Sequence, residues 1–317
     1  MITPYKINTH LFGIKIEIIC DDRKLYSALS GFISQPCGPC DSRQRITIKL
    51  SIIKDRHWRV PAFGNKQIPV FYAPYIKCFW DKQKRYYFYT DLKEYLAILK
   101  SKSRVDGLIA EELLTKPNFI RHAIIIPLIS EVFKLNELYK LHAAALENEK
   151  RGLLFVGPSG SAKTTLSLIL VKKGYQFISD DLVFIKYPGH TIEAASIINT
   201  DFKVKTKANN CEVVKMLNPS IIWPKAKINR TTIQSVIFPK ITNQAKTKII
   251  HIDYAEAFGL LLKSNSLIAY GPQGIIRKHI SCFKKIASLK ERYIIFLGKD
   301  ALIKPEVVPG ILDSLAK

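Results

Sequence analysis

Acidic residues are scarce in this chain. Its 317 residues include 26 Asp and Glu against 49 Lys and Arg, which gives a formal net charge of +23. A charge of this size favours an acidic partner, such as a nucleotide, an acidic peptide, nucleic acid or an anionic membrane surface. The basic residues are spread along the chain rather than grouped in blocks. This distribution is also typical of surface lysines that contact only water.

Long hydrophobic runs and internal repeats are also absent. The most apolar window, residues 123–135, is shorter than the roughly 20 residues needed to cross a bilayer, and it contains Glu131 and Lys134. The opening residues, MITPYKINTHLF, have no basic segment followed by an apolar one, so no secretory signal peptide is expected there. Hydrophobic residues make up 47% of the chain. We therefore expect a globular cytoplasmic protein without a membrane span.

The six cysteines do not form a disulfide framework, because only Cys37 and Cys40 are close in sequence. Cys37-Gly38-Pro39-Cys40 has the C-x-x-C spacing of thioredoxin-type redox sites, which need a strand before the motif and a helix after it. Here a strand pattern, Ile46 to Leu50, follows. A zinc site would need a second pair of ligands with suitable spacing. We interpret the motif as a Gly-Pro turn and keep redox and zinc as alternatives.

The chain reads as two domains, with a β-rich segment at 1–118 and a nucleotide-binding segment at 119–317. Ile14–Ile18 alternates apolar and polar residues, as a half-buried strand does. Residues 75–90 predict a hairpin of aromatic-rich strands with its turn at 81–84. Asp91, with Glu94 three residues later, predicts a short capped helix.

The second segment has the strand, loop, helix and strand order of an α/β nucleotide-binding core. Leu153 to Val156 is a short, fully apolar strand, and 138–146 predicts another strand before it. A helix is expected to run to Lys173 and to end at Gly174, before the strand Gln176 to Ser179. Further strands are predicted at 182–185, 191–192, 236–239, 249–252 and 293–297, and helices at 253–262 and after Pro305.

The loop between the first of these strands and the helix has the pattern of a Walker-type phosphate loop. Its backbone N–H groups and the helix N-terminus would bind phosphates, Lys163 would contact the β- and γ-phosphates, and the Thr164 hydroxyl would bind Mg²⁺. The predicted ATP-binding residues are Gly157, Pro158, Ser159, Gly160, Ser161, Ala162, Lys163, Thr164 and Thr165.

Ala162 stands where this type of loop usually has glycine. If the loop requires a positive φ there, a Cβ atom costs roughly 1–2 kcal/mol. We expect this strain to weaken nucleotide binding by about tenfold without abolishing it.

Two adjacent carboxylates, Asp180 and Asp181, follow the strand after the helix. This strand end is expected beside the loop, where ligands collect in open α/β sheets. One carboxylate is suited to hold Mg²⁺ and the other to accept a proton from an attacking hydroxyl. His142, on the preceding strand, is a further candidate.

These residues resemble the catalytic core of the HPr kinase/phosphorylase family. The resemblance covers about residues 119–185 and is carried by His142-Ala143, the loop at 157–165, Lys172-Lys173-Gly174-Tyr175 and Asp180-Asp181-Leu182-Val183. The same core is similar to that of phosphoenolpyruvate carboxykinases. Kinases encoded with lasso-peptide biosynthesis, which phosphorylate a precursor peptide on a seryl hydroxyl, are smaller relatives.

The resemblance implies a role for each matching residue. Lys163 and the loop amides would hold the nucleotide phosphates, and Thr164 with Asp180 would lie at the metal. Asp181 would be the base for the acceptor serine, and His142 would line the same site. Relatives are often oligomeric, so a homo-oligomer is a further expectation.

Two departures from the family pattern bear on the activity. The family histidine is usually followed by glycine, and here Ala143 follows it. The Glu-Ile-Arg-Gly signature of the bifunctional enzymes, which serves metal binding and phosphorolysis, is absent after Asp181, where only Glu193 and Glu212 are nearby carboxylates. This pattern favours a kinase without phosphorylase activity.

The sequence therefore predicts an ATP- and Mg²⁺-dependent serine kinase acting on a peptide or protein, with the 1–118 segment recognising the acceptor. One alternative is a non-catalytic, nucleotide-gated module that binds nucleic acid, and another is a small-molecule kinase for a free serine-type acceptor. The aromatic and basic residues of 79–89 are of the types that stack on nucleic-acid bases, and they are equally typical of an ordinary hairpin with aromatic pairs across its strands. Two interpretations also remain for the alternating lysines Lys203, Lys205 and Lys207. They could form a surface that binds an acidic peptide, or they could lie on a strand edge exposed to water.

Overall fold

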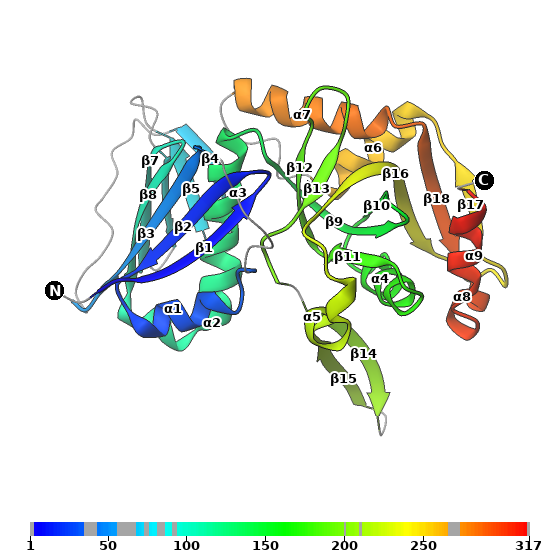
Figure 1. Cartoon of the computed structure of the whole chain (residues 1–317), viewed down its shortest axis with the longest axis horizontal. Coiled ribbons are helices and arrows are strands. Elements are labelled where there is room, and N and C mark those ends of the chain that lie inside the picture. Colours follow the sequence, from blue (N-terminus) through cyan, green and yellow to red (C-terminus); the bar gives the residue numbers. More distant parts are fainter. Residues whose placement is uncertain are drawn as a thin grey trace. The chain divides into compact units, whose positions relative to one another are not determined.

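The computed structural model describes residues 3–34, 43–55, 68–72, 76–80, 86–90, 94–199, 201–208, 211–265 and 273–315. Over these ranges the protein is a mixed α/β structure (Figure 1). It divides into two compact units, one of residues 1–139 with 267–279 and the other of residues 140–266 with 280–317. The sequence predicted a boundary after residue 118, whereas the first compact unit continues to residue 139.

The first unit is built on a sheet that has eight strands among the described residues, in the order β1-β2-β3-β8-β7-β6-β5-β4. The pairs β2–β3 and β3–β8 are parallel, and the other neighbours are antiparallel. The strands are β1 (Tyr5–Leu11), β2 (Ile14–Cys20), β3 (Arg45–Ile53), β4 (Ile68–Tyr72), β5 (Ile76–Trp80), β6 (Tyr86–Thr90), β7 (Tyr95–Ser101) and β8 (Arg104–Ala110).

Helices accompany this sheet. In α1, the Asp22 side chain caps the N-terminus by accepting hydrogen bonds from the backbone N–H groups of Lys24 and Leu25. Pro127 lies in the first turn of α3, where proline is well tolerated. The helical elements are α1 (Arg23–Ser30), η1 (Glu111–Thr115), α2 (Pro117–Phe119), the π-helix η2 (Ile120–Ile125) and α3 (Ile126–Leu135).

Of two local predictions in this unit, the hairpin strands are confirmed and the helix is wrong. Strands β5 and β6 pair antiparallel from Ile76↔Thr90 to Trp80↔Tyr86, so the predicted hairpin strands are confirmed, while the turn at 81–84 lies outside the described residues. The helix predicted from Asp91 is wrong for the described residues 94–101, which include strand β7. That strand hydrogen-bonds to β6 and β8 and buries Tyr95, Ala97 and Leu99, so pairing on both sides outweighed the local capping pattern.

The second unit contains the strands that hold the candidate site. Among the described residues, β10-β9-β12-β13-β16 are hydrogen-bonded in that order, and β10 also pairs with β16 in parallel. Strands β18 and β17 extend the sheet from β16, and β11 pairs with β9. The strands are β9 (Tyr139–Asn148), β10 (Arg151–Val156), β11 (Gln176–Ser179), β12 (Leu182–Lys186), β13 (Glu193–Ala195), β16 (Arg230–Ile241), β17 (Lys248–His251) and β18 (Glu291–Leu297).

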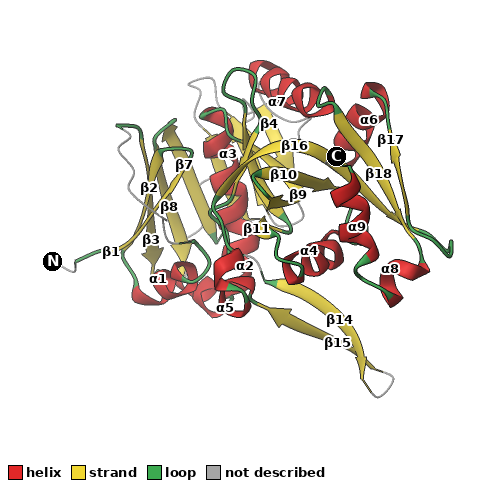
Figure 2. Ribbon diagram, turned by 45° about the vertical axis from the view of Figure 1, so that its right-hand side comes forward, coloured by secondary structure: helices red, strands yellow, loops and turns green. Residues whose placement is uncertain are grey.

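A two-stranded antiparallel ribbon, β14 (Phe202–Ala208) and β15 (Cys211–Leu217), forms a separate sheet in this unit (Figure 2). It contains Lys203, Lys205 and Lys207, whose side chains lie outside the described part of the structure. The helical elements of the unit are α4 (Lys163–Lys172), α5 (Pro219–Ile222), η3 (Pro224–Ala226), α6 (Tyr254–Ser264), α8 (Lys299–Ile303) and α9 (Val307–Ser314), together with the end of α7 (Gln273–Ala287).

An apolar core fixes the sheet against α4 and α9. Leu166 and Leu170 of α4 and Leu312 of α9 are buried in one cluster with Phe155 of β10 and Ile237 of β16. Helix α4 ends as predicted, because Gly174 adopts φ +97° and lets the N–H group of Tyr175 donate to the carbonyl of Leu170 at 3.1 Å. The core therefore holds the start of α4 at a defined place beside β10.

Candidate functional site

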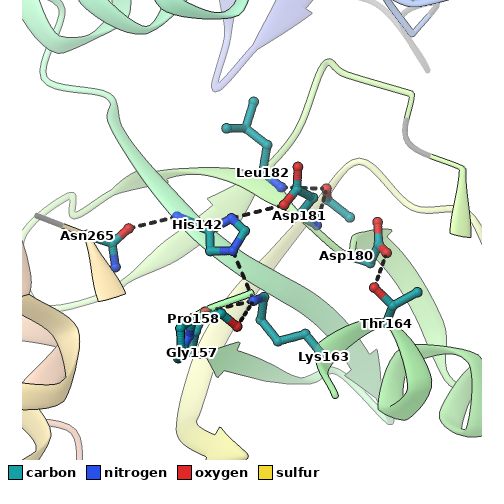
Figure 3. A network of polar contacts seen from close by, with 10 residues as sticks. His142, Gly157, Pro158, Lys163, Thr164, Asp180, Asp181, Leu182 and Asn265 are labelled. Carbon is teal, nitrogen blue, oxygen red and sulfur yellow. Dashed lines mark hydrogen bonds and ion pairs between the residues drawn. The ribbon is translucent and has the colours of Figure 1, made fainter. Parts of the chain in front are cut away.

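Strand direction brings three separate segments of the second unit to one edge of the sheet. Strand β9 is antiparallel to both β10 and β11, so both of these strands end beside the start of β9. Val156 at the end of β10 is registered with Ala143, and Ser179 at the end of β11 with Ala145. His142, the 157–165 loop and the two aspartates that follow β11 consequently lie together (Figure 3).

The 157–165 segment, here the candidate phosphate loop, turns tightly between β10 and α4. Gly157 is required by packing, because a Cβ atom there would lie 2.5 Å from Oγ of Ser161. Gly160 has φ +82°, and the N–H group of Ser161 donates to the carbonyl of Pro158 at 3.3 Å. Helix α4 begins at Lys163 with no side-chain cap, so its first N–H groups are available to an anion.

Ala162 adopts the left-handed conformation that the sequence suggested, with φ +74° and ψ +18°. The loop geometry normally calls for glycine at such a position, because a Cβ atom in this region costs roughly 1–2 kcal/mol. The folded loop therefore carries local strain at the residue that precedes Lys163.

The Lys163 ammonium group lies inside the turn rather than in solvent. Its Nζ atom donates to the carbonyls of Gly157 at 2.7 Å and Pro158 at 3.0 Å, and it lies 3.0 Å from Nε2 of His142. Burial lowers the pKa of Lys163 from its ordinary value, while the nearby Asp181 and Asp180 carboxylates act in the opposite direction. The side chain is thus placed to neutralise phosphate charge within the loop.

His142 connects Lys163 with Asp181. Its Nδ1 atom lies 2.9 Å from Oδ1 of Asp181, and its Nε2 atom faces the Lys163 ammonium group. Because an ammonium group can only donate, we assign Nε2 as an acceptor and the ring proton to Nδ1, which then donates to Asp181. The hydrogen bond from His142 lowers the pKa of Asp181, burial opposes this shift, and the positive charges of Lys163 and Lys140 add to it.

The two aspartates differ in their surroundings. Asp180 is only 5% exposed, and its Oδ2 atom accepts a hydrogen bond from Oγ1 of Thr164 at 2.9 Å. The side chain of Asp181 is 59% exposed. Asp180 is therefore directed toward the first turn of α4, while the Asp181 carboxylate can be reached from solvent.

Thr164 and Asp180 together fit a magnesium site by their chemistry. A hydroxyl and a carboxylate are hard oxygen donors, and Mg²⁺ in nucleotide sites is held by few protein ligands, with phosphates and water completing its shell. The described residues contain no group of three or more His, Cys, Asp or Glu side chains that could hold a metal by themselves. The buried Ser161 hydroxyl has no hydrogen-bond partner among the described residues, which suits a loop that binds phosphate.

One residue of this network could not be found from the sequence. Oδ1 of Asn265, at the end of α6, accepts a hydrogen bond from the backbone N–H group of His142 at 2.8 Å. The two residues are far apart in the chain, and no motif includes Asn265.

Glu193, another predicted candidate, pairs with a residue outside this network. The Glu193 carboxylate lies 3.8 Å from Arg230, and the Glu212 side chain lies outside the described part of the structure, as do Cys37 and Cys40. Ser159 and Thr165 are exposed at the loop. No helix in the described parts of the chain combines the length and apolar character that a membrane crossing requires.

No protein-family model matches this chain. No curated protein matches it either. Among solved structures, the chain is similar to the HPr(Ser) kinase/phosphatase from Coxiella burnetii, with 15% sequence identity and a TM-score of 0.32, over 56% of this chain and 95% of that one. The chemistry of the site is therefore inferred from the side-chain contacts of the second unit.

Proposed function

We propose that this protein is an ATP-dependent kinase that transfers the γ-phosphoryl group to a seryl hydroxyl of a peptide or protein. The observation that carries the proposal is the arrangement at one sheet edge of a loop lysine, a Thr164–Asp180 oxygen pair and an exposed Asp181 bonded to His142. The lysine would bind phosphate, the oxygen pair would bind a metal, and Asp181 would orient the acceptor hydroxyl.

The loop residues would bind and neutralise the phosphates of ATP. The N–H groups at the start of α4 and the Lys163 ammonium group donate hydrogen bonds to phosphate oxygens. Thr164 and Asp180 would hold Mg²⁺, which when bound neutralises charge on the β- and γ-phosphates. The backbone and Lys163 thus stabilise the charge that shifts to the leaving β-phosphate oxygen.

Asp181 would orient the acceptor and take its proton. As the seryl oxygen forms its bond to the γ-phosphorus, the bond to the β-phosphate oxygen breaks, and the hydroxyl proton passes to the Asp181 carboxylate. The products are a phosphoserine and ADP. The lowered pKa of Asp181 keeps it ionised at neutral pH, and a loose transition state needs orientation of the nucleophile more than a strong base. His142 holds this carboxylate through its Nδ1 proton.

The net charge of +23 supports an acidic peptide or protein as the acceptor, because it would accelerate encounter with a negatively charged chain. A biosynthetic precursor peptide is one specific candidate. The first unit is proposed to recognise that acceptor.

The test is transfer of labelled phosphate. Purified protein, Mg²⁺ and γ-labelled ATP are incubated with heat-treated extract from the source cells, in parallel with the Lys163→Ala variant. A labelled polypeptide that is absent with the variant is expected, and sequencing it would identify the acceptor. Labelling of free serine would support the small-molecule alternative, and ATP binding without any transfer would support the nucleotide-gated binding module.

Two isosteric variants test which aspartate accepts the proton and which binds the metal. Asp181→Asn is expected to lower transfer by roughly 10²- to 10⁴-fold with little change in Mg²⁺–ATP affinity, since it removes the group that accepts the proton. Asp180→Asn is expected to weaken Mg²⁺-dependent nucleotide binding. If Asp181→Asn instead weakens Mg²⁺-dependent binding and Asp180→Asn only slows transfer, Asp180 is the proton acceptor and Asp181 the metal ligand.

A further inference from the structure

The backbone of His142 needs a hydrogen-bond acceptor that the sheet does not supply. Consecutive N–H groups along a strand point to opposite sides, and the N–H group of Ala143 donates to the carbonyl of Asp181 at 3.2 Å. The N–H group of His142 therefore points toward the β10 side. On that side β10 ends at Val156, which is registered with Ala143, and the chain then turns into the candidate phosphate loop.

Asn265 supplies this acceptor from a distant element. Its Oδ1 atom lies 2.8 Å from the backbone nitrogen of His142, where a continuing β10 strand would have offered a carbonyl (Figure 3). A side-chain amide thus replaces a backbone group at the point where the strand has to end to make room for the loop.

Asn265 is itself fixed to α6. It is the C-terminal cap of this helix, its backbone N–H group donates to the carbonyl of Leu262, and its Nδ2 atom donates to the carbonyl of Leu261 at 3.1 Å. With Nδ2 facing a carbonyl and Oδ1 facing an N–H group, only one orientation of the amide satisfies both contacts. Ala257 and Leu261 are fully buried, which holds α6 in place.

We propose that Asn265 is a positioning residue for His142, an inference that rests on the proposed kinase function for its catalytic consequence. The imidazole makes both of its contacts, to Asp181 at 2.9 Å and to Lys163 at 3.0 Å, from a backbone position set by Asn265. Displacement of a reacting group by about 1 Å can cost on the order of 10²-fold in rate. Asn265 itself touches none of the groups proposed to react.

The test compares Asn265→Ala with Asn265→Asp. The alanine variant removes the acceptor and is expected to lower kcat by roughly 10- to 100-fold without raising the KM for ATP, because His142 contacts neither the nucleotide-binding N–H groups nor the metal pair, and its contact with Lys163 would compete with the phosphates rather than assist them. The aspartate variant keeps an oxygen acceptor for the His142 N–H group but loses the bond to the Leu261 carbonyl, so it is expected to recover part of the loss.

Asp253→Ala is the matched control. Asp253 caps the other end of α6 by accepting from the N–H group of Glu256 at 2.8 Å, and its removal loosens the helix without touching the His142 contact. Its kcat is expected to stay within about twofold of the unmodified protein. If Asp253→Ala lowers kcat as much as Asn265→Ala, or if Asn265→Asp recovers nothing, the positioning role is wrong.

A second readout needs no enzymatic activity. Nitrogen-15 NMR of the imidazole groups reports which ring nitrogen carries the proton, and the His142 signals can be assigned by their loss in His142→Gln. Asn265→Ala is expected to shift these signals away from the Nδ1-protonated form, and Asp253→Ala to leave them unchanged. Unchanged His142 signals in Asn265→Ala would overturn the inference, whereas failure of the unmodified protein to transfer phosphate would overturn only the proposed function.

Discussion

The Nζ atom of Lys163 lies 3.0 Å from the Nε2 atom of His142. The same ammonium group also donates to two carbonyls of its own loop. Under the proposed function this charge would face the nucleotide, so His142 and the phosphates would compete for one donor. The contact joins Lys163, which is proposed to bind phosphate, to His142, which is bonded to Asp181.

Removal of the Nε2 contact alone is expected to tighten nucleotide binding. In His142→Asn the amide nitrogen can take the place of Nδ1 and keep the bond to Asp181, but the side chain is too short to reach Lys163. Because hydrogen bonds to charged groups contribute about 1.5–3 kcal/mol, Mg²⁺–ATP affinity, measured by calorimetry, should rise by roughly tenfold or more. His142→Gln, whose amide can take the place of Nε2 instead, is the control and should bind as the unmodified protein does. Weaker binding by His142→Asn would contradict this competition.

Replacement of Ala162 by glycine is expected to stabilise the protein. The residue has φ +74°, so loss of its Cβ atom relieves roughly 1–2 kcal/mol of strain, of which greater freedom of the unfolded chain offsets part. The free energy of unfolding in urea should increase by about 1 kcal/mol. Ala255→Gly, at an exposed helical position of α6, is the matched control and should be destabilising. A decrease for Ala162→Gly would show that the strain assignment is incorrect.

The Thr164 hydroxyl is expected to matter only when magnesium is present. Thr164→Val preserves the shape of the side chain and removes the oxygen that bonds to Asp180. Mg²⁺-dependent ATP affinity should fall at least about tenfold, whereas in EDTA the variant and the unmodified protein should bind alike. Ser167→Ala, which removes a buried hydroxyl with no hydrogen-bond partner among the described residues of the same unit, is the control. Equal losses with and without Mg²⁺ would point to a structural role for Thr164.

Three cysteines are expected to be unreactive in the folded protein. Burial raises the pKa of the Cys20 thiol to about 12, with Asp21 and Asp22 adding to the shift, and burial also raises the pKa of Cys78 and Cys282. Since the thiolate is the reacting form, these groups should resist a disulfide reagent at pH 8. Of the six cysteines, no more than the other three should react in the native state, and all six in guanidinium. Reaction of a fourth native thiol would contradict the burial.

Local pattern alone predicted much of the second unit. Strand β11 occupies the predicted residues Gln176–Ser179, α6 begins one residue after its predicted capping aspartate, and α9 begins two residues after Pro305. These features depend on neighbouring residues, through side-chain alternation, caps and glycine geometry. For the same reason the requirement for a left-handed residue at Ala162 was visible in the motif.

Contacts between residues distant in sequence determined the features that local pattern did not predict. Residues 94–101 carry a helix-start signal and yet include strand β7, because β6 and β8 hydrogen-bond on both sides of it. The sequence named Asp180 and Asp181 as a pair, but only the packing against α4 buries the first and leaves the second exposed. Asn265 meets His142 because β10 ends where the loop begins and α6 runs back to that point. A sequence determines which groups are present and their local geometry, whereas the register of distant strands determines which of those groups touch.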